Sequence, residues 1–410
     1  MSFEGVKINQ LNGGLGGEND STDNIVALIC AVDLADLPGT VAHHVPYLCL
    51  QTADAEALGV DASFDANKKF LIHNAIEQFF LYAPEAKIYL IFAPVATAVV
   101  IAGTDGVKGA LRQASEVKGF GFVNIADELA DVVGEVEGLQ AIVDGFKAEH
   151  RLFDFVIVPA MGDAVEVALA DYPDLRAKAA ANISVCIAQD PTVAATLPEY
   201  AKYADVGAAL GMLAIRGVNE NLGSVDINKK PSAKRGDKDY PLTDEASNRW
   251  LSATLSDGKK VSDLSAVEKK SLTTKGYIYA GSYDGYAGVF FNSSPTSVEK
   301  VSDYAYIERN RTWNKAARAI RNVLIPEVKR TVKKDETTGY IRSTTITRWT
   351  GIVKKVLEVM EAADEISGSS VYINPKQILS ETSPLNIKVK VISDGIVYEF
   401  EIDLGLSTKL

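Results

Sequence analysis

The chain has 410 residues, of which 47% are hydrophobic and 23% are charged, and its formal net charge is −12. This length predicts two or three domains, and this composition is typical of a folded soluble protein. The acidic balance argues against generic nucleic-acid binding, and the sequence shows neither a membrane-spanning apolar run nor the pattern of a secretory signal at its start.

Cysteine usage and charge distribution add two constraints. The three cysteines, Cys30, Cys49 and Cys186, form no Cys-x-x-Cys pair, so we expect buried free thiols in a reducing compartment. Residues 1–284 carry a net charge of −15, whereas residues 285–410 carry a net charge of +3. The sequence therefore predicts an acidic N-terminal part joined to a part with a basic stripe.

The first 24 residues are rich in glycine, asparagine and aspartate. Val6 to Leu11 alternates apolar and polar residues like a short strand, and Asn12 to Gly17 is glycine-rich, so we expect an extended arm. A phosphate-binding loop at Gly13 to Gly17 is the alternative. The segment lacks the Lys-Ser/Thr pair of a P-loop and the spacing of a dinucleotide-binding fingerprint, which favours the arm.

The next part of the chain alternates between strand and helix patterns. Strands are predicted at 25–32, 87–95, 153–158 and 182–188, and helices at 67–81, 107–117, 139–150, 175–180, 197–216 and 264–272. A polar connection follows at 218–248, and two short strands are expected within 277–291. Such alternation predicts a mainly parallel sheet with helices on both faces.

The polar residues of this region do not form a recognisable catalytic or metal-binding motif. Those considered are His43, His44, His73, His150, Asp33, Asp36, Asp54, Glu56, Ser184 and Cys186. Adjacent histidines on a strand point to opposite faces, which disfavours a shared ion. The acidic residues lack the spacing of a calcium loop, and Ser184 lacks a nucleophile-elbow motif. We expect structural or solvated roles for these residues.

Two amphipathic helices follow. The first runs from Tyr306 to Val332 with one apolar and one basic face, and Pro326 should kink or interrupt it. The second runs from Thr345 to Ala363. We expect Trp313 and Trp349, which lie on the apolar faces, to be core residues.

The basic face of the first helix has three interpretations. Nucleic-acid binding is disfavoured by the acidic chain and the absence of a known binding signature. A contact with a partner protein and a solvated face remain open. In the solvated case the acidic residues available for pairing are Glu308, Glu327, Asp335 and Glu336.

The C-terminus has the pattern of a β-hairpin. Ser393-Asp394-Gly395 is a strong turn signal. With Asp394 and Gly395 as the loop, Val391 faces Tyr398, Val389 faces Phe400 and Ile387 faces Ile402, while Lys390 meets Glu399 and Lys388 meets Glu401 on the other side. One face would be apolar and the other would pair opposite charges. The edges of this hairpin would remain open to strands from elsewhere.

Several of these segments together resemble the contractile tail sheath proteins of phage tails, tailocins and related contractile injection systems. The segments are Asn12 to Gly16, Gly288 to Asn292, Ser302 to Tyr304, Arg309 to Arg321, Asp335 to Gly339 and Val389 to Leu404. The resemblance implies an α/β and α+β fold. An inner sheath domain, with helices on a small β-sheet completed by neighbouring subunits, would carry an inserted α/β outer domain. The boundaries implied are an arm at 1–24, an outer domain at 25–275 and an inner domain at 276–410.

What the resemblance implies about function is mechanical. Subunits of such a sheath form stacked hexameric rings around an inner tube, between a baseplate and a terminator or cap, and contract to drive the tube through a target envelope. The expected location is a virion tail or an assembled particle in the bacterial cytoplasm. No cofactor, metal, catalytic residue, membrane or direct nucleic-acid contact is expected.

The resemblance also implies roles for particular residues. Strand exchange between subunits would use Val6, Ile8, Gln10, Val397, Glu399, Glu401 and Asp403, and the hinge glycines would be Gly13, Gly14, Gly16 and Gly17. The tube-facing basic candidates are Arg309, Arg311, Lys315, Arg318, Arg321, Lys329, Arg330, Lys354 and Lys355. The sequence does not decide which strands are donated. The competing functions are an α/β enzyme, suggested by the strand–helix alternation, and another virion or tail component.

Overall fold

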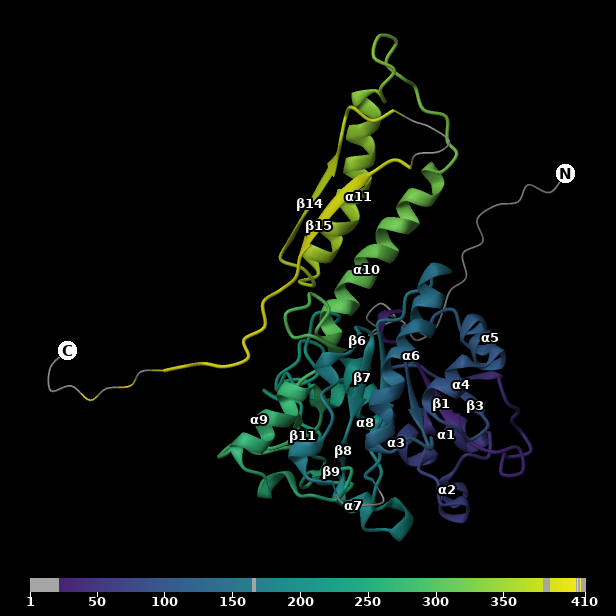
Figure 1. Cartoon of the computed structure of the whole chain (residues 1–410), viewed down its shortest axis with the longest axis vertical. Helices are drawn as coiled ribbons and strands as arrows, with labels where there is room; N and C mark the ends of the chain where they lie inside the picture. The colour runs from purple at the N-terminus through teal and green to yellow at the C-terminus, as the bar shows by residue number, and fades with distance from the viewer. Residues whose placement is uncertain (1–21, 164–166, 379–383, 403, 405, 407–410) are drawn as a thin grey trace.

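The computed structural model describes residues 22–163, 167–378, 384–402, 404 and 406. An α/β body fills the lower part of Figure 1, and a long helix rises from it to carry a second, elongated unit. The C-terminal segment runs away from both units in an extended conformation. The fold therefore consists of two packed parts and one projecting segment.

A seven-stranded sheet forms the centre of the α/β body. Its strands, in spatial order, are β10 (Tyr277–Ile278), β7 (Ile183–Cys186), β5 (Phe155–Pro159), β4 (Gly119–Val123), β1 (Val26–Ala31), β3 (Ile88–Ala93) and β2 (Pro46–Cys49). All neighbouring pairs are parallel except β2 with β3. Every residue of β1 is buried, as expected for a central strand covered on both faces. The predicted mainly parallel sheet is confirmed.

Helices cover both faces of this sheet. They are α1 (Thr52–Ala57), α2 (Ala62–Lys68), α3 (Ile72–Tyr82), α4 (Ala98–Gly103), α5 (Asp105–Gln113), α6 (Leu129–Ala148), α7 (Pro191–Ala194), α8 (Val206–Ile215) and α9 (Ala266–Lys275). Strand β4 shows the two faces. A Cβ at Gly121 would meet Val206 of α8, whereas Phe120 packs through Phe153 on Phe146 of α6.

Short elements complete the α/β body. They are the strands β6 (Ala179–Ala180), β8 (Ala188–Gln189), β9 (Thr254–Leu255), β11 (Ala280–Gly281), β12 (Phe290–Phe291) and β13 (Ser297–Val298), and the 3-10 turns η1 (Thr22–Asn24), η2 (Leu169–Asp171), η3 (Leu175–Ala177), η4 (Pro198–Tyr200), η5 (Ser232–Lys234) and η6 (Val261–Asp263). The helix predicted at 175–180 is wrong, because this segment is a 3-10 turn followed by β6. Tyr277, Ile278, Val289 and Phe291, which follow the predicted outer domain, pack in the core of the α/β body.

The second unit contains two long helices and two strands. They are α10 (Ile307–Leu324), the 3-10 turn η7 (Ile325–Glu327), α11 (Ser343–Ala362), β14 (Gly368–Ile373) and β15 (Ile387–Ile392). The first part of α10 is buried in the α/β body, and its later residues Ile320 and Leu324 form a core with Val353 and Leu357 of α11. Helix α10 ends before Pro326, as proline in a helix interior requires.

The predicted C-terminal hairpin is wrong. Strand β15 forms, but its antiparallel partner is β14, with Val371 opposite Val389 and Ser370 opposite Lys390. Residues 393–402 form no strand within the described part of the chain. At the position of the expected turn, the Asp394 carboxylate accepts hydrogen bonds from Asn219 and Ser367.

Candidate assembly interface

The C-terminal arm, defined here as the described residues 399–402, 404 and 406, has an exposed apolar surface. Its large apolar side chains point into solvent: Phe400 and Ile402 are each 80% exposed, and Leu404 is 91% exposed. Glu399 and Glu401 alternate with them, so an extended arm has one apolar and one acidic face. A monomeric soluble protein rarely exposes such a row, and exposed apolar surface of this kind marks an interaction site.

The two-stranded sheet offers a complementary surface. Its inner face, which includes Val371, Val389 and Val391, packs on α10 and α11. Its outer face carries Lys388 and Lys390. Among the described residues the sheet contains β14 and β15 alone, so each strand has one edge without a strand partner. Open edges present unpaired N–H and C=O groups to which another chain can add.

Arg311 is the clearest correction among the basic candidates on α10. Its side chain is 1% exposed, and its guanidinium donates to the carbonyl oxygens of Leu213 and Gly217, each at 3.1 Å, and of Arg216 at 3.3 Å. These carbonyls lie at the end of α8, where helix carbonyl groups lack partners and attract cations. Burial lowers the pKa of Arg311, and nearby carboxylates oppose that shift. The prediction that Arg311 faces a tube is wrong, because the residue is internal.

Lys315 and Arg318 also bind within the chain. The Lys315 ammonium lies 2.6 Å from Asp23 and 2.5 Å from Glu365. Burial alone would lower its pKa, but these two carboxylates raise it. Arg318 donates to both oxygens of the fully buried Asp154, at 2.9 and 3.3 Å. The two cations therefore join α10 to the start of the described chain, to the α/β body and to the second unit.

The remaining basic candidates differ in exposure. Arg309 is half-buried, and its guanidinium lies 5.3 Å from the centre of the Tyr306 ring. Five are exposed: Arg321, Lys329, Arg330, Lys354 and Lys355. Arg330 pairs with Glu327 at 3.0 Å, and Lys354 pairs with Glu358 at 3.4 Å. The five exposed cations can meet a partner without breaking the fold.

Other predicted interface residues lie outside the described part of the chain. They are Val6, Ile8, Gln10, Gly13, Gly14, Gly16, Gly17 and Asp403. Val397, Glu399 and Glu401 are described and exposed.

The two tryptophans behave differently. Trp349 is buried as predicted, and its indole N–H donates to Glu327 at 3.0 Å. Trp313 is 41% exposed, so the prediction that it is a core residue is wrong. It lies edge-to-face with Tyr304 and under the ammonium of Lys147. This part of α10 faces the polar end of α6, which leaves the indole at the surface.

Several polar candidates of the α/β body are buried or bond within the fold. Cys30, Cys49 and Cys186 are buried free thiols, as predicted, and burial raises the pKa of Cys49 to about 12. The ring of His43 bonds the carbonyl of Val32 at 2.8 Å. Among the described residues, no cluster of three or more histidine, cysteine or acidic side chains could hold a metal ion.

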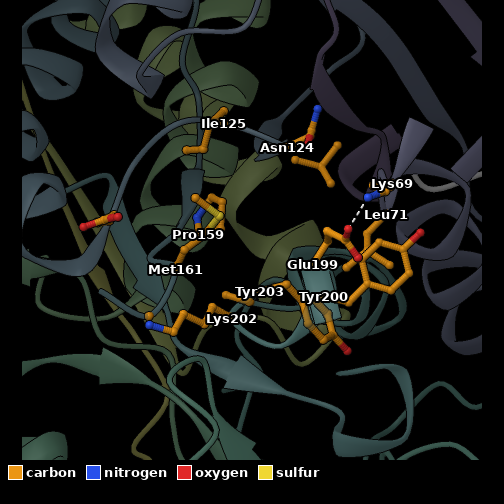
Figure 2. A pocket seen from close by; sticks show the side chains of 14 residues that line it. Lys69, Leu71, Asn124, Ile125, Pro159, Met161, Glu199, Tyr200, Lys202 and Tyr203 are labelled. Atoms are coloured by element: carbon orange, nitrogen blue, oxygen red, sulfur yellow. Dashed lines mark hydrogen bonds and ion pairs between the residues drawn. The ribbon is translucent and has the colours of Figure 1, made fainter. Parts of the chain in front are cut away.

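One pocket lies at the carboxyl ends of β4 and β5, where open α/β sheets commonly bind ligands. It has a volume of about 330 Å³ and is lined by Leu71, Ile125, Pro159 and Met161 together with charged residues at its mouth (Figure 2). Three of these charged residues have partners within the chain: Lys69 pairs with Glu199, and Lys202 donates to the carbonyl of Asp163.

Sequence reasoning missed two features of the interface. One is β14, which lacks a strong alternating pattern and yet supplies the partner of β15. The other is the ion cluster of Asp23, Lys315 and Glu365, whose members are far apart in the sequence and give no local signal.

Comparisons with known proteins address the fold and the family. The sequence model described as DUF2586, N-terminal domain, matches residues 3–295, and the model described as DUF2586, C-terminal domain, matches residues 303–410. A search of curated proteins finds no match. No helix within the described ranges has the length and apolarity to cross a membrane.

Three solved structures resemble the chain. A chain of the anti-feeding prophage baseplate is 14% identical, with a TM-score of 0.60 and 100% of both chains covered. A chain of the sheath complex of the PVC extracellular contractile injection system, in its contracted state, is 12% identical, with a TM-score of 0.59 and coverage of 100% and 99%. The sheath tail protein Lin1278 from Listeria innocua is 11% identical, with a TM-score of 0.48 and coverage of 90% and 94%. The first two matches show a mixed α/β fold shared with chains of contractile injection particles.

Proposed function

Because the chain belongs to the DUF2586 family and has the fold of a contractile sheath protein, we propose that it is a structural subunit of a contractile sheath. Copies would assemble as stacked hexameric rings around an inner tube, bounded by baseplate and terminator proteins. Contraction of this lattice would drive the tube through a target envelope. The chain would act mechanically and without catalysis, in a virion tail or as an assembled particle in the bacterial cytoplasm.

The exposed C-terminal arm is the observation that carries this proposal. Phe400, Ile402 and Leu404 lack a covering surface among the described residues. Burying such side chains stabilises a contact by about 1.5–3 kcal/mol each before the cost of ordering the arm. A neighbouring copy supplies an open sheet edge over an apolar helix pair, so the arm fits as an added strand.

Charge favours the edge of β15 as the acceptor. A strand added there would turn its apolar side toward the helices and its acidic side toward the face that carries Lys388 and Lys390. Glu399 and Glu401 would then meet the two lysines across the strands. In a single copy the arm runs away from β15 (Figure 1), which supports a pairing between copies. The other open edge, on β14, suits the N-terminal Val6, Ile8 and Gln10, with Gly13, Gly14, Gly16 and Gly17 as a leash.

The exposed cations are proposed contacts with the tube. Arg321, Lys329 and Lys355 have no ion-pair partner among the described residues. An exposed charge pair contributes roughly 0–1 kcal/mol and is screened by salt. Contacts that are weak singly and numerous together suit a sheath that must release its tube.

Electron microscopy of the purified chain tests the proposal. Full-length protein is expected to form hollow cylinders at high concentration. A variant truncated after Tyr398 is expected to keep the same circular dichroism spectrum and melting behaviour while remaining monomeric. Full-length protein that stays monomeric, or truncated protein that still forms cylinders, would contradict the proposal.

A baseplate-associated component is the second candidate, because one structural match is a chain of a baseplate. The same micrographs separate the two functions. A sheath subunit gives cylinders of variable length, whereas a baseplate component gives single closed rings.

A further inference from the structure

The segment between β15 and the arm, residues 393–398, is held at two points. The first is Asp394. Its carboxylate accepts one hydrogen bond from the Asn219 amide and one from the Ser367 hydroxyl, each at 2.6 Å. Asn219 follows α8 in the α/β body and also donates to the carbonyl of Asp364 at 2.7 Å. Asp394 therefore ties the end of the second unit to the α/β body.

The second point is Tyr398. Its ring lies 5.2 Å from the ring of Tyr306, with an angle of 33° between the two planes. The guanidinium groups of Arg176 and Arg309 lie 5.2 and 5.3 Å from the Tyr306 ring centre. Cation–π and aromatic contacts of this kind each contribute roughly 0.5–1.5 kcal/mol.

The Tyr306 ring beneath Tyr398 lies against Arg176, which is held by hydrogen bonds. Arg176 is 8% exposed and donates to the carbonyl oxygens of Thr296 at 3.1 Å and Ala305 at 2.8 Å. Burial raises the pKa of the Tyr398 phenol, and the nearby Glu308 carboxylate adds to the shift. The Tyr398 ring thus contacts a packed surface through Tyr306, while much of the residue stays exposed.

The exposed fraction of the large side chains rises directly after Tyr398. Tyr398 is 54% exposed, whereas Phe400 and Ile402 are each 80% exposed. We infer that the contacts of Asp394 with Asn219 and Ser367, and of Tyr398 with Tyr306, form an arm anchor that fixes where the C-terminal arm leaves the subunit. The strand offered to a neighbouring copy then begins at Glu399, and Val397 belongs to the fixed root.

An anchored root has two physical consequences. It removes the conformational freedom of residues 393–398 before assembly, so less entropy is lost when the arm binds. It also limits the registers that the arm can reach, and a slip of one residue would turn the apolar side chains to the wrong face. The role of the anchor in assembly rests on the proposed sheath function, whereas its existence is a property of the single subunit.

A nitroxide spin label tests the anchor in the free subunit. The native cysteines are fully buried, so a label at V397C or I402C reacts selectively. The label at position 397 should move slowly, and the label at 402 should show the fast motion of a free chain end. Tyr398→Ala with Asn219→Ala should raise the mobility at 397 toward that at 402. The matched control Tyr372→Ala removes an exposed tyrosine of β14 and should change nothing.

Assembly provides the second readout. The Tyr398→Ala/Asn219→Ala protein should form fewer or shorter cylinders than wild type, and Tyr398→Phe, which keeps the ring, should remain close to wild type. Equal label mobility at 397 and 402 in the wild type would overturn the anchor whether or not cylinders form. If the double variant shows raised label mobility at position 397 and still forms normal cylinders, the anchor has no role in assembly and the sheath function stands. Absence of wild-type cylinders would overturn the sheath function, while the label would still decide the anchor.

Discussion

Arg311 and Arg321 lie on one helix and look alike in the sequence, yet they have different roles. Arg311 is enclosed by the carbonyl groups that end α8, whereas Arg321 is exposed near the end of α10. An amphipathic pattern separates apolar from polar positions, but it does not separate solvent from a buried group of carbonyl oxygens. The polar face of a helix can therefore be predicted from its sequence, and the partner of each cation cannot.

Substitution at these two positions should change the stability of the fold by very different amounts. Arg311→Ala leaves buried carbonyl oxygens unpaired and opens a cavity, so we expect a loss of about 3 kcal/mol in the free energy of unfolding. Arg321→Ala should change it by less than about 0.5 kcal/mol. Urea denaturation of the two variants measures the difference. Equal stability of both would show that the buried guanidinium is not structural.

Asp205 gives a prediction about pH. Its carboxylate caps α8 by accepting from the Ala208 N–H at 2.9 Å, and its other oxygen has no partner. Burial, with the charge of Asp190, raises its pKa from 3.8 to about 7. Because the folded state holds the proton more tightly than the unfolded state, this group adds stability as the pH falls from above 7 toward 4.

Asp205→Asn should remove that dependence, because asparagine caps a helix as well as aspartate and carries no charge. At pH 8 the variant should be more stable than wild type, by on the order of 1–3 kcal/mol, and the difference should shrink by pH 5. Thermal unfolding between pH 5 and 8 measures it. The control is Asp61→Asn at the exposed cap of α2, where no such trend is expected. A variant less stable than wild type at pH 8 would refute the argument.

At the scale of elements, glycines explain both a missed strand and a close helix contact. Strand β4 (GFGFV) was not predicted, because glycine is a poor strand residue. In the sheet, a Cβ at Gly121 would lie 2.6 Å from Val206, so glycine is present to let α8 approach. Sequence patterns identified the other long parallel strands, but they could not locate a strand whose composition serves packing against a neighbour.

The contact between α3 and α8 depends on the same effect. A Cβ at Gly207 would lie 2.2 Å from the backbone oxygen of Ala75, whereas one at Gly134 of α6 would meet nothing within 4 Å. Gly207→Ala should therefore destabilise the fold by about 3 kcal/mol or more through overpacking. Gly134→Ala should stabilise it by up to about 1 kcal/mol through helix propensity. The melting temperatures of the two variants measure these changes. An unchanged melting temperature for Gly207→Ala would mean that α3 and α8 can move apart without loss of stability.

The hairpin prediction failed for an instructive reason. Alternation in residues 387–392 and 397–402 predicted two strands with matched charges, and only the first of them, β15, forms in the described part of the chain. Pattern alone does not state whether matched segments pair within one chain or between copies. In the structure β14 is the partner of β15, and the second segment stays exposed. The partner of a strand thus depends on contacts between distant segments, and the strand-exchange residues stay a prediction.

For the whole molecule, the separation of the arm from β15 is the feature that suggests assembly. A folded domain normally buries its apolar segments, whereas Phe400, Ile402 and Leu404 stay exposed among the described residues of this chain. Charges on the arm and on the sheet are of opposite sign, and each subunit carries both halves of the proposed contact. A surface that donates at one place and accepts at another makes a head-to-tail contact, which generates rings or helical lattices.

Charge exchange across this contact is the prediction that belongs to the assembled molecule. Lys388→Glu with Lys390→Glu, or Glu399→Lys with Glu401→Lys, should place like charges opposite each other and raise the concentration needed for cylinders by about tenfold, the equivalent of 1.4 kcal/mol. The variant carrying all four changes restores opposite charges and should assemble near the wild-type concentration. Sedimentation of assembled material measures this concentration, and Lys270→Glu on the exposed side of α9 controls for net charge. If the fourfold variant needs a still higher concentration to assemble than either double variant, the effects of the two double variants add. That result would show that the arm does not lie beside β15.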